Sequence, residues 1–260
     1  MQIDPLRDGA RLAVRSIDRG AGVGSRWAGR RSGVDVCGYG SSVARVMRLD
    51  VAALLFDNDG VLVDSHEQVL AAWRQLASEL GLDPDRLLGE VVGVRAVDTL
   101  SRYLPAADVP AAVARLEDLE VAGAATSVAL AGASELIGRT PSGRWTIVTS
   151  GSRRLAEARW RGAGIPIPPV AITADDVARG KPDPEPYVRA AALLGVDPAE
   201  CLVFEDSGAG ALAAVAAGAR VIAVGDEPWD VEPVARIGNL TAVSVAGGAD
   251  GLAVELERSR

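Results

Sequence analysis

Five short apolar runs, separated by stretches with helical patterns, constrain the fold of this chain most strongly. The runs lie at residues 51–56, 145–149, 169–172, 201–204 and 220–224. Continuous apolar runs of this length are typical of strands that are buried on both faces, and their alternation with helical stretches indicates a parallel sheet covered by helices on both sides. We therefore predict an α/β fold, a doubly wound parallel sheet with a Rossmann-like core.

A long insertion separates the first two predicted strands. Residues 65–140 are too many for a simple crossover. Their pattern is helical, with apolar residues three or four apart at Val69, Trp73, Leu76 and Leu80 and a stop at Gly81. Further helical stretches follow near 95–104 and 109–122. We predict a helical cap domain over 65–140 that closes over the site and excludes water, and a catalytic core made of 49–64 and 141–260. Near the C-terminus we expect an edge strand at 241–245 and a last helix at 249–257.

Acidic residues follow two of the predicted strands. Asp57 and Asp59 come directly after the first apolar run, and Glu205 and Asp206 end the fourth. An acid-rich turn or a helix cap would explain one such pair. Because the carboxyl ends of parallel strands meet at one edge of a sheet, Asp57, Glu205 and Asp206 together predict an oxygen-only pocket suited to Mg²⁺.

Hydroxyls and one lysine occur after or between other strands. Thr149, Ser150 and Gly151 lead from the second strand into a helical stretch, where hydroxyls and backbone N–H groups can hold an anion, although they can equally cap the helix. Lys181 lies between Gly180 and Pro182, which places it in a constrained loop. Its ammonium can offset negative charge on a nucleophile and on phosphate.

The four segments together carry a resemblance to a known family, and two of them are the most specific. Phe-Asp-Asn-Asp-Gly-Val-Leu-Val-Asp-Ser at 56–65 and Gly-Lys-Pro-Asp-Pro at 180–184 resemble motifs of the haloacid dehalogenase-like hydrolase superfamily. The branch is that of the 2-deoxyglucose-6-phosphate and glycerol-3-phosphate phosphatases and the β-phosphoglucomutases. The match runs from about residue 51 to about 226. Asn58 stands where an apolar residue is more usual. The resemblance implies a helical cap of the type that admits small substrates.

The resemblance also implies roles for the two acids of the first motif. Asp57 is expected to attack phosphorus and to become an aspartyl-phosphate. Asp59 is expected to protonate the leaving alcohol and then to activate water, and its backbone carbonyl is expected to bind Mg²⁺.

Roles for the other motifs follow from the same resemblance. Ser150, or alternatively Thr149, is expected to hold a phosphate oxygen, with Gly151 beside it. Lys181 is expected to orient Asp57 and the phosphate, and Glu205 and Asp206 to complete the metal shell.

Three residues of the predicted cap are candidates for substrate contacts. Arg95 lies in a segment that resembles the substrate-facing loop of the sugar phosphatases, but a solvated arginine at a helix start has the same pattern. Glu120 can reach substrate hydroxyls or can belong to a salt-bridged helix face. His66, the one histidine of the chain, follows the start of the cap and is a possible substrate contact.

Three alternatives to a phosphatase are weighed. A mutase of this branch carries a histidine on its first cap helix, where this chain has Val69. A phosphonate hydrolase needs a cap lysine, and Lys181 is the single lysine of the chain. A non-catalytic sugar-phosphate-binding regulator would be expected to lose a catalytic acid. We therefore predict a Mg²⁺-dependent phosphatase, a phosphoric monoester hydrolase, that acts on a small sugar or polyol phosphate.

Composition limits the partners. A net charge of −8 and a pI of about 4.8 argue against a nucleic-acid-binding surface, and no apolar run approaches the ~20 residues that span a bilayer. Two cysteines, Cys37 and Cys201, do not suggest a disulfide framework, and we expect Cys201 to be a buried free thiol. The expected protein is cytoplasmic, a monomer or small homo-oligomer, with a small phosphorylated metabolite as its partner.

The first 48 residues differ from the rest. They contain nine Arg and four Asp, are rich in Gly and Ser, and show no apolar core of a signal peptide. A basic interaction arm and a targeting segment are possible functions. We predict instead a disordered extension, and we expect a chain that begins at Met47 to keep its fold and activity.

Overall fold

The computed structural model describes residues 46–248 and 251–257. The helices are α1 (His66–Leu80), α2 (Pro84–Leu88), α3 (Ala96–Leu100), α4 (Val109–Gly123), α5 (Ala133–Arg139), α6 (Arg153–Ala163), α7 (Glu185–Leu194) and α8 (Gly208–Ala216). The strands are β1 (Val46–Val51), β2 (Ala53–Phe56), β3 (Val63–Asp64), β4 (Val128–Ala129), β5 (Trp145–Val148), β6 (Ala171–Ile172), β7 (Cys201–Glu205), β8 (Arg220–Val224), β9 (Ala235–Ile237), β10 (Val243–Gly248) and β11 (Gly251–Glu257).

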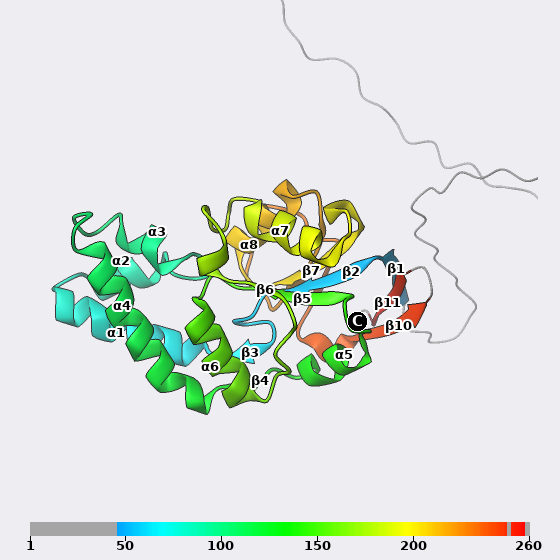
Figure 1. Ribbon diagram of the computed structural model, residues 1–260, viewed down its shortest axis with the longest axis horizontal. Coiled ribbons are helices and arrows are strands. Elements are labelled where there is room, and N and C mark those ends of the chain that lie inside the picture. Colours follow the sequence, from blue (N-terminus) through cyan, green and yellow to red (C-terminus); the bar gives the residue numbers. More distant parts are fainter. Residues whose placement is uncertain (1–45, 249–250, 258–260) are drawn as a thin grey trace, which may run out of the picture. The chain divides into compact units, whose positions relative to one another are not determined.

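A six-stranded parallel sheet forms the centre of the core, in the order β6-β5-β2-β7-β8-β9. Successive residues of β2 point to opposite faces. Leu54 and Phe56 pack with α5 and α6, whereas Ala53 and Leu55 pack with α7 and α8. Figure 1 shows these two helical layers on either side of the strands. The predicted doubly wound α/β fold is confirmed, and β2, β5 and β7 are neighbours whose carboxyl ends meet.

The insertion after β2 is helical, as its apolar spacing indicates. Helices α1 to α4 form a hydrophobic cluster of their own, around Trp73, Leu76, Leu100 and Leu116. α1 ends at Gly81, which takes a left-handed conformation with φ of 66°. These helices extend away from the sheet, at the left of Figure 1.

The chain leaves and re-enters the core through two short paired strands. Val63 of β3 lies opposite Ala129 of β4, and Asp64 opposite Val128. The next helix, α5, contributes Leu136 and Ile137 to the cluster under the sheet. We therefore propose that the cap comprises residues 65–127 rather than 65–140, with β3 and β4 as its hinge.

The C-terminal segment is a strand, and the prediction of a helix at 249–257 is wrong. β11 (Gly251–Glu257) pairs antiparallel with β1 on one side and with β10 on the other. Leu252, Val254 and Leu256 are buried and alternate with more exposed residues. This period of two belongs to a strand with one buried face. The expected edge strand at 241–245 is β10, which extends to Gly248.

The N-terminal boundary also needs correction. Val46, Met47 and Arg48 belong to β1 and lie opposite Glu257, Leu256 and Glu255, so the predicted extension cannot reach residue 48. The rest of that prediction, and Cys37, fall on residues 1–45 and lie outside the described residues.

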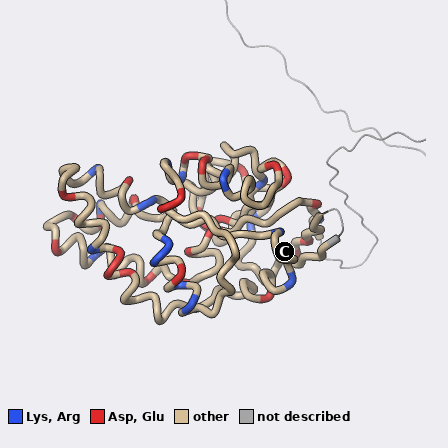
Figure 2. Tube along the Cα trace, viewed as in Figure 1, with Lys and Arg blue, Asp and Glu red and all other residues tan. Residues whose placement is uncertain are grey.

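Two further expectations from composition can be compared with the structure. Cys201 is a buried free thiol, as predicted. Among the described residues no helix is long and apolar enough to cross a membrane. Figure 2 shows acidic and basic residues interspersed along the chain, and several form exposed ion pairs such as Arg115 with Glu79.

Candidate active site

Lys181 is the centre of a buried polar cluster at the carboxyl ends of β2, β5 and β7. Its ammonium contacts the carboxylate of Asp57, donates to Glu205 Oε1 at 2.5 Å and donates to the Val148 carbonyl at 3.2 Å. Since Lys181 is only 2% exposed, all three donors are satisfied within the protein. The Asp57 N–H donates to the Phe204 carbonyl at 2.9 Å, which fixes the nucleophile candidate beside β7.

Glu205 uses both carboxylate oxygens for hydrogen bonds. Oε1 accepts from Lys181 and from the Tyr187 hydroxyl at 2.6 Å. Oε2 accepts from the backbone N–H groups of Asp206 and Ser207 and from the Ser207 hydroxyl, at 3.0–3.1 Å. A Cβ at position 210 would lie 1.7 Å from Oε1, so Gly210 makes room for this carboxylate. These contacts orient Glu205 toward Lys181.

Negative charge exceeds positive charge in this cluster. Burial raises the pKa of Asp57 to about 7 although Lys181 opposes the shift, and burial together with Asp57 and Glu205 raises the pKa of Asp206. Burial acts to lower the pKa of Lys181, but the two carboxylates outweigh it and raise that pKa. A further cation bound among these carboxylates would therefore stabilise the cluster.

Mg²⁺ fits the donors that are present. Carboxylate oxygens of Asp57, Glu205 and Asp206 lie within 4.8 Å of one another, and oxygen donors are what this ion prefers. Gly60, with φ of 80°, lets Asp206 approach, because a Cβ there would lie 1.9 Å from Asp206 Oδ2. Since Glu205 already accepts five hydrogen bonds, Asp57 and Asp206 are the better direct ligands.

The carboxylate of Asp59 lies apart from these three and faces the cap. Oδ1 accepts from the Ser65 hydroxyl at 2.5 Å, and Oδ2 accepts from Arg159 Nη1 at 2.9 Å. Ser65 is the residue before α1, and Arg159 lies on α6. Both oxygens are thus held by side chains from outside the loop that carries Asp59.

The predicted hydroxyl residues divide into two roles. Thr149 is buried, and its Oγ1 accepts from the Gly151 N–H at 3.1 Å, so it shapes the turn. Ser150 Oγ lines the cavity and donates to the Gly93 carbonyl of the cap at 2.8 Å. Ser152, which was not predicted, caps α6 and donates to Glu117 of α4.

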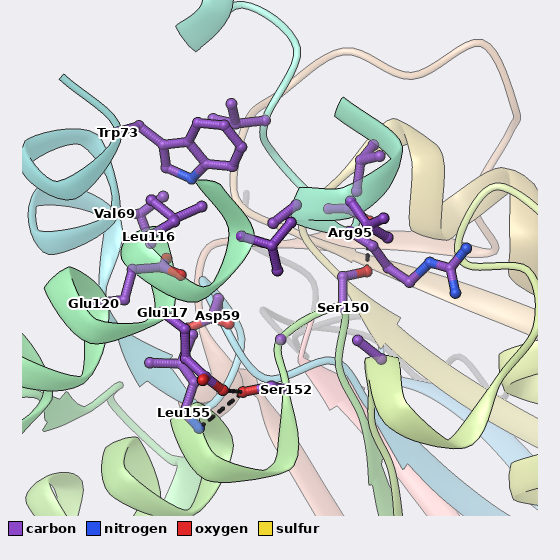
Figure 3. A pocket seen from close by; sticks show the side chains of 18 of the residues that line it. Asp59, Val69, Trp73, Arg95, Leu116, Glu117, Glu120, Ser150, Ser152 and Leu155 are labelled. Atoms are coloured by element: carbon purple, nitrogen blue, oxygen red, sulfur yellow. Dashed lines mark hydrogen bonds between the residues drawn. The ribbon is translucent and has the colours of Figure 1, made fainter. Parts of the chain in front are cut away.

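The three cap candidates differ in how they are placed. Arg95 forms an ion pair with Asp98 and donates to the Val177 and Ala178 carbonyls of the core at 3.0 and 3.1 Å. Its guanidinium is directed away from Glu117 and Glu120 (Figure 3). Glu120 is buried and pairs with Arg159 at 3.1 Å. His66 is exposed and lines the cavity.

A cavity of about 590 Å³ lies between cap and core and joins these groups. Its polar part includes Asp59, Asp206, Ser150 and the acids of α4. Apolar side chains line the same cavity beside these acids (Figure 3), with Val69, Trp73, Leu116 and Leu155 among them. The arrangement suits a small ligand that offers both hydroxyls and C–H groups.

Sequence reasoning missed Arg159 and Tyr187, which contact the predicted acids. Arg159 follows the buried Leu155 by one helical turn on α6, so its spacing already placed it on the buried face. Tyr187 carries no comparable signal. Asn58, the departure from the usual motif, is fully buried and accepts from Trp160 Nε1 at 2.8 Å.

Fold and site together define an α/β enzyme with a buried acid–lysine centre beneath a helical cap. Comparison with known proteins identifies the family, because the family model of haloacid dehalogenase-like hydrolases matches residues 51–218. This chain belongs to that family, and the predictions of the superfamily and of an enzyme are confirmed.

Similar proteins agree with this assignment. Hexitol phosphatase A of Escherichia coli is 43% identical over 175 residues, which cover 65% of this chain and 81% of that protein. Glycerol-1-phosphate phosphohydrolase 2 of Saccharomyces cerevisiae is 33% identical over 190 residues, covering 68% and 76%. The crystal structure of a hydrolase from Pseudomonas syringae shares the fold, with a TM-score of 0.64, 24% identity and coverage of 73% of this chain and 94% of that one.

Proposed function

We propose that this enzyme is a Mg²⁺-dependent phosphatase that hydrolyses a small sugar or polyol monophosphate through an aspartyl-phosphate. The observation that carries the proposal is the buried cluster of Asp57, Lys181, Glu205 and Asp206, of which Asp206 lines the cavity under the cap. Similarity to a hexitol phosphatase and a glycerol-1-phosphate phosphohydrolase supports the same substrate class.

Asp57 is the nucleophile in this proposal. One carboxylate oxygen attacks phosphorus while the bond from phosphorus to the alcohol oxygen breaks. Lys181 holds that carboxylate in place and offsets its charge, and Glu205 holds Lys181. Mg²⁺, held by Asp57, Asp206 and the Asp59 carbonyl, would neutralise charge on the phosphate oxygens.

Asp59 moves the protons. Its carboxyl donates a proton to the leaving alcohol oxygen, and its carboxylate then takes a proton from the water that attacks the phosphorylated Asp57. Ser65 and Arg159 hold the Asp59 carboxylate where it lines the cavity. The Ser150 hydroxyl, which here donates to Gly93, can turn to a phosphate oxygen.

The charges of the cavity favour a substrate with one phosphate and a neutral remainder. Both arginines that line it, Arg95 and Arg159, are paired with carboxylates. Glu117 and Glu120 can accept hydrogen bonds from substrate hydroxyls, and they would repel a second phosphate. A mutase that forms a bisphosphate intermediate needs a second phosphate site, so this charge pattern and Val69 favour the phosphatase over the mutase.

The buried free thiol of Cys201 accords with a reducing compartment, and we propose a cytoplasmic enzyme that acts as a monomer or small homo-oligomer.

Phosphate release from a panel of sugar and polyol monophosphates, measured with Mg²⁺ and with EDTA, tests the proposal. We expect release that EDTA abolishes and that Asp57→Asn reduces to background. Release that persists in Asp57→Asn would contradict the mechanism. If no ester is hydrolysed by the wild type, conversion of β-glucose 1-phosphate decides whether the mutase alternative holds.

A further inference from the structure

Arg159 joins three parts of the molecule through one buried guanidinium. It lies on α6 of the core, its side chain is 4% exposed, and it contacts Asp59 Oδ2 at 2.9 Å and Glu120 Oε1 at 3.1 Å. Asp59 belongs to the loop after β2, and Glu120 belongs to cap helix α4. A buried guanidinium is costly unless it is paired, so both carboxylates are required partners rather than incidental neighbours.

Other residues of α6 also contact the cap without reaching Asp59. Arg154 pairs with Glu117 at 3.0 Å and Asp118 at 2.7 Å, but its side chain is 55% exposed. Exposed pairs of this kind contribute little to stability. Arg154 and Arg159 therefore lie on the same helix, and both pair with cap helix α4. Only Arg159 also holds Asp59.

Both side chains that hold Asp59 are tied to the cap. Ser65, which donates to Oδ1, directly precedes cap helix α1, and Arg159, which donates to Oδ2, is held from its other side by Glu120. With the cap closed, the rotation of the Asp59 carboxyl group is thus fixed from two directions. A proton donor that is misplaced by about 1 Å loses much of its effect.

We propose that Arg159 is a positioning residue that couples closure of the cap, through Glu120, to the placement of the Asp59 carboxyl group. Arg159 keeps its own proton throughout, since a guanidinium does not deprotonate in proteins. The proton that reaches the alcohol oxygen as its bond to phosphorus breaks comes from Asp59, and the proton of the attacking water goes to Asp59. The inference rests on the acid–base role proposed for Asp59.

The test compares two leaving groups in Arg159→Gln. An alkyl phosphate such as a hexitol phosphate needs protonation of its leaving oxygen, whereas p-nitrophenyl phosphate does not. In a single turnover we expect Arg159→Gln to release the alkyl alcohol about 100-fold more slowly than wild type, and p-nitrophenol less than about 5-fold more slowly. Steady-state turnover of both esters should fall, because hydrolysis of phosphorylated Asp57 still needs Asp59.

Two further variants and one control complete the design. Arg159→Lys and Glu120→Gln should show the same dependence on the leaving group with smaller losses, and they keep the test valid if Arg159→Gln does not fold. Arg154→Gln should stay within about 3-fold of wild type on both esters, since exposed pairs matter little.

The contrary outcomes are distinct. Equal losses on both esters in the Arg159 and Glu120 variants, or no loss, would overturn the positioning role. Wild type and Asp59→Asn are measured alongside. An inactive wild type contradicts the proposed phosphatase itself, whereas a leaving-group-dependent loss in Asp59→Asn that is absent from Arg159→Gln overturns the inference about Arg159 alone.

Discussion

At the core end of the site, Asp57 and Glu205 lie at the ends of the adjacent strands β2 and β7, and Lys181 reaches both carboxylates from the loop before α7; the three side chains are buried. At the cap end, Glu120 and Arg159 meet from two helices that belong to different parts of the chain. The first group lies wholly within the core. The second exists as an arrangement only while cap and core are in contact.

We therefore expect the core end to carry out the phosphoryl transfer and the cap end to select the substrate. The core end concentrates charge where phosphorus would be attacked, and its geometry does not depend on the substrate alcohol. The cap end lines the cavity with apolar side chains and two carboxylates, which would surround that alcohol. Changes at the core end should therefore affect every substrate equally, and changes at the cap end should affect substrates unequally.

The largest expected effect is that of Lys181→Met at the core end. The change leaves Asp57 and Glu205 buried without their cation, so we expect phosphate release to fall at least about 1,000-fold on all esters. We also expect a loss of about 3–5 kcal/mol in the free energy of unfolding near pH 8. This loss should shrink toward pH 5.5, because the buried Asp57 carboxylate, whose pKa burial raises, can then take up a proton. Denaturant unfolding at both pH values measures it, and Arg189→Met, an exposed cation on α7, is the control. An equal loss at both pH values would contradict the account.

A second test of the core end is Gly60→Ala. The new Cβ would lie 1.9 Å from Asp206 Oδ2, so we expect the Mg²⁺ concentration for half-maximal activity to rise at least about 10-fold. Gly81→Ala is the matched control, because Gly81 also has positive φ and no atom lies within 4 Å of its added Cβ. Both variants should lose some thermal stability, but only Gly60→Ala should change the Mg²⁺ dependence. The same change in both would mean that backbone strain, not the fit around Asp206, is responsible.

At the cap end, Glu120→Gln should change how stability depends on pH. Burial raises the pKa of Glu120 to about 7 although Arg159 opposes the shift. The folded state therefore holds this proton more tightly than the unfolded state, so stability falls as pH rises from about 4.5 to about 7. We expect the difference in unfolding free energy between pH 5 and pH 8 to be smaller in Glu120→Gln by on the order of 1–2 kcal/mol.

Glu79→Gln serves as the control for this measurement. A hydrogen bond from Arg115 lowers the pKa of Glu79 to about 2, so its stabilising contribution is lost only as pH falls below the usual carboxyl range. The control should leave the difference between pH 5 and pH 8 unchanged. If the unfolding free energy of Glu120→Gln changes between pH 5 and pH 8 by as much as that of wild type, Glu120 does not titrate in this range.

The smallest effects compare one tyrosine from each end. Tyr187 is fully buried and donates to Glu205, whereas Tyr103 in the cap donates to Glu90 at 3.0 Å near the surface. We expect Tyr187→Phe to lower the free energy of unfolding by about 1–2 kcal/mol and Tyr103→Phe by less than about 0.5 kcal/mol. Equal effects in denaturant unfolding would indicate that the core end is not the more tightly organised one.

Sequence reasoning succeeded where a residue follows directly from the end of a strand. Asp57, Glu205 and Asp206 could be placed together because neighbouring parallel strands end at one edge of the sheet. The cap end could not be predicted in the same way. The contact of Arg159 with Asp59 joins positions 100 residues apart, and its contact with Glu120 depends on how α4 and α6 pack.

Two local misjudgements have a common cause. The segment 251–257 alternates more and less buried residues, as a strand does. Ala, Leu and Glu are also good helix formers, however, and this composition favoured the prediction of a helix. Val46 to Arg48 were assigned to the basic extension by charge, although they pair with β11. In both places pairing between β1 and β11, which lie at opposite ends of the described chain, decides the structure.

The most direct test of the central claim is to trap the phosphoryl group. Asp59→Asn, mixed with p-nitrophenyl phosphate and Mg²⁺ and quenched in acid, should accumulate phosphorylated enzyme, because this ester needs no proton from Asp59 and the subsequent hydrolysis does. Peptide mass spectrometry should find one phosphoryl group on Asp57 in nearly stoichiometric amount, and none in the Asp57→Asn/Asp59→Asn double variant. A phosphoryl group on another residue, or p-nitrophenol released over many turnovers with no labelled peptide, would contradict the assignment of Asp57 as the nucleophile.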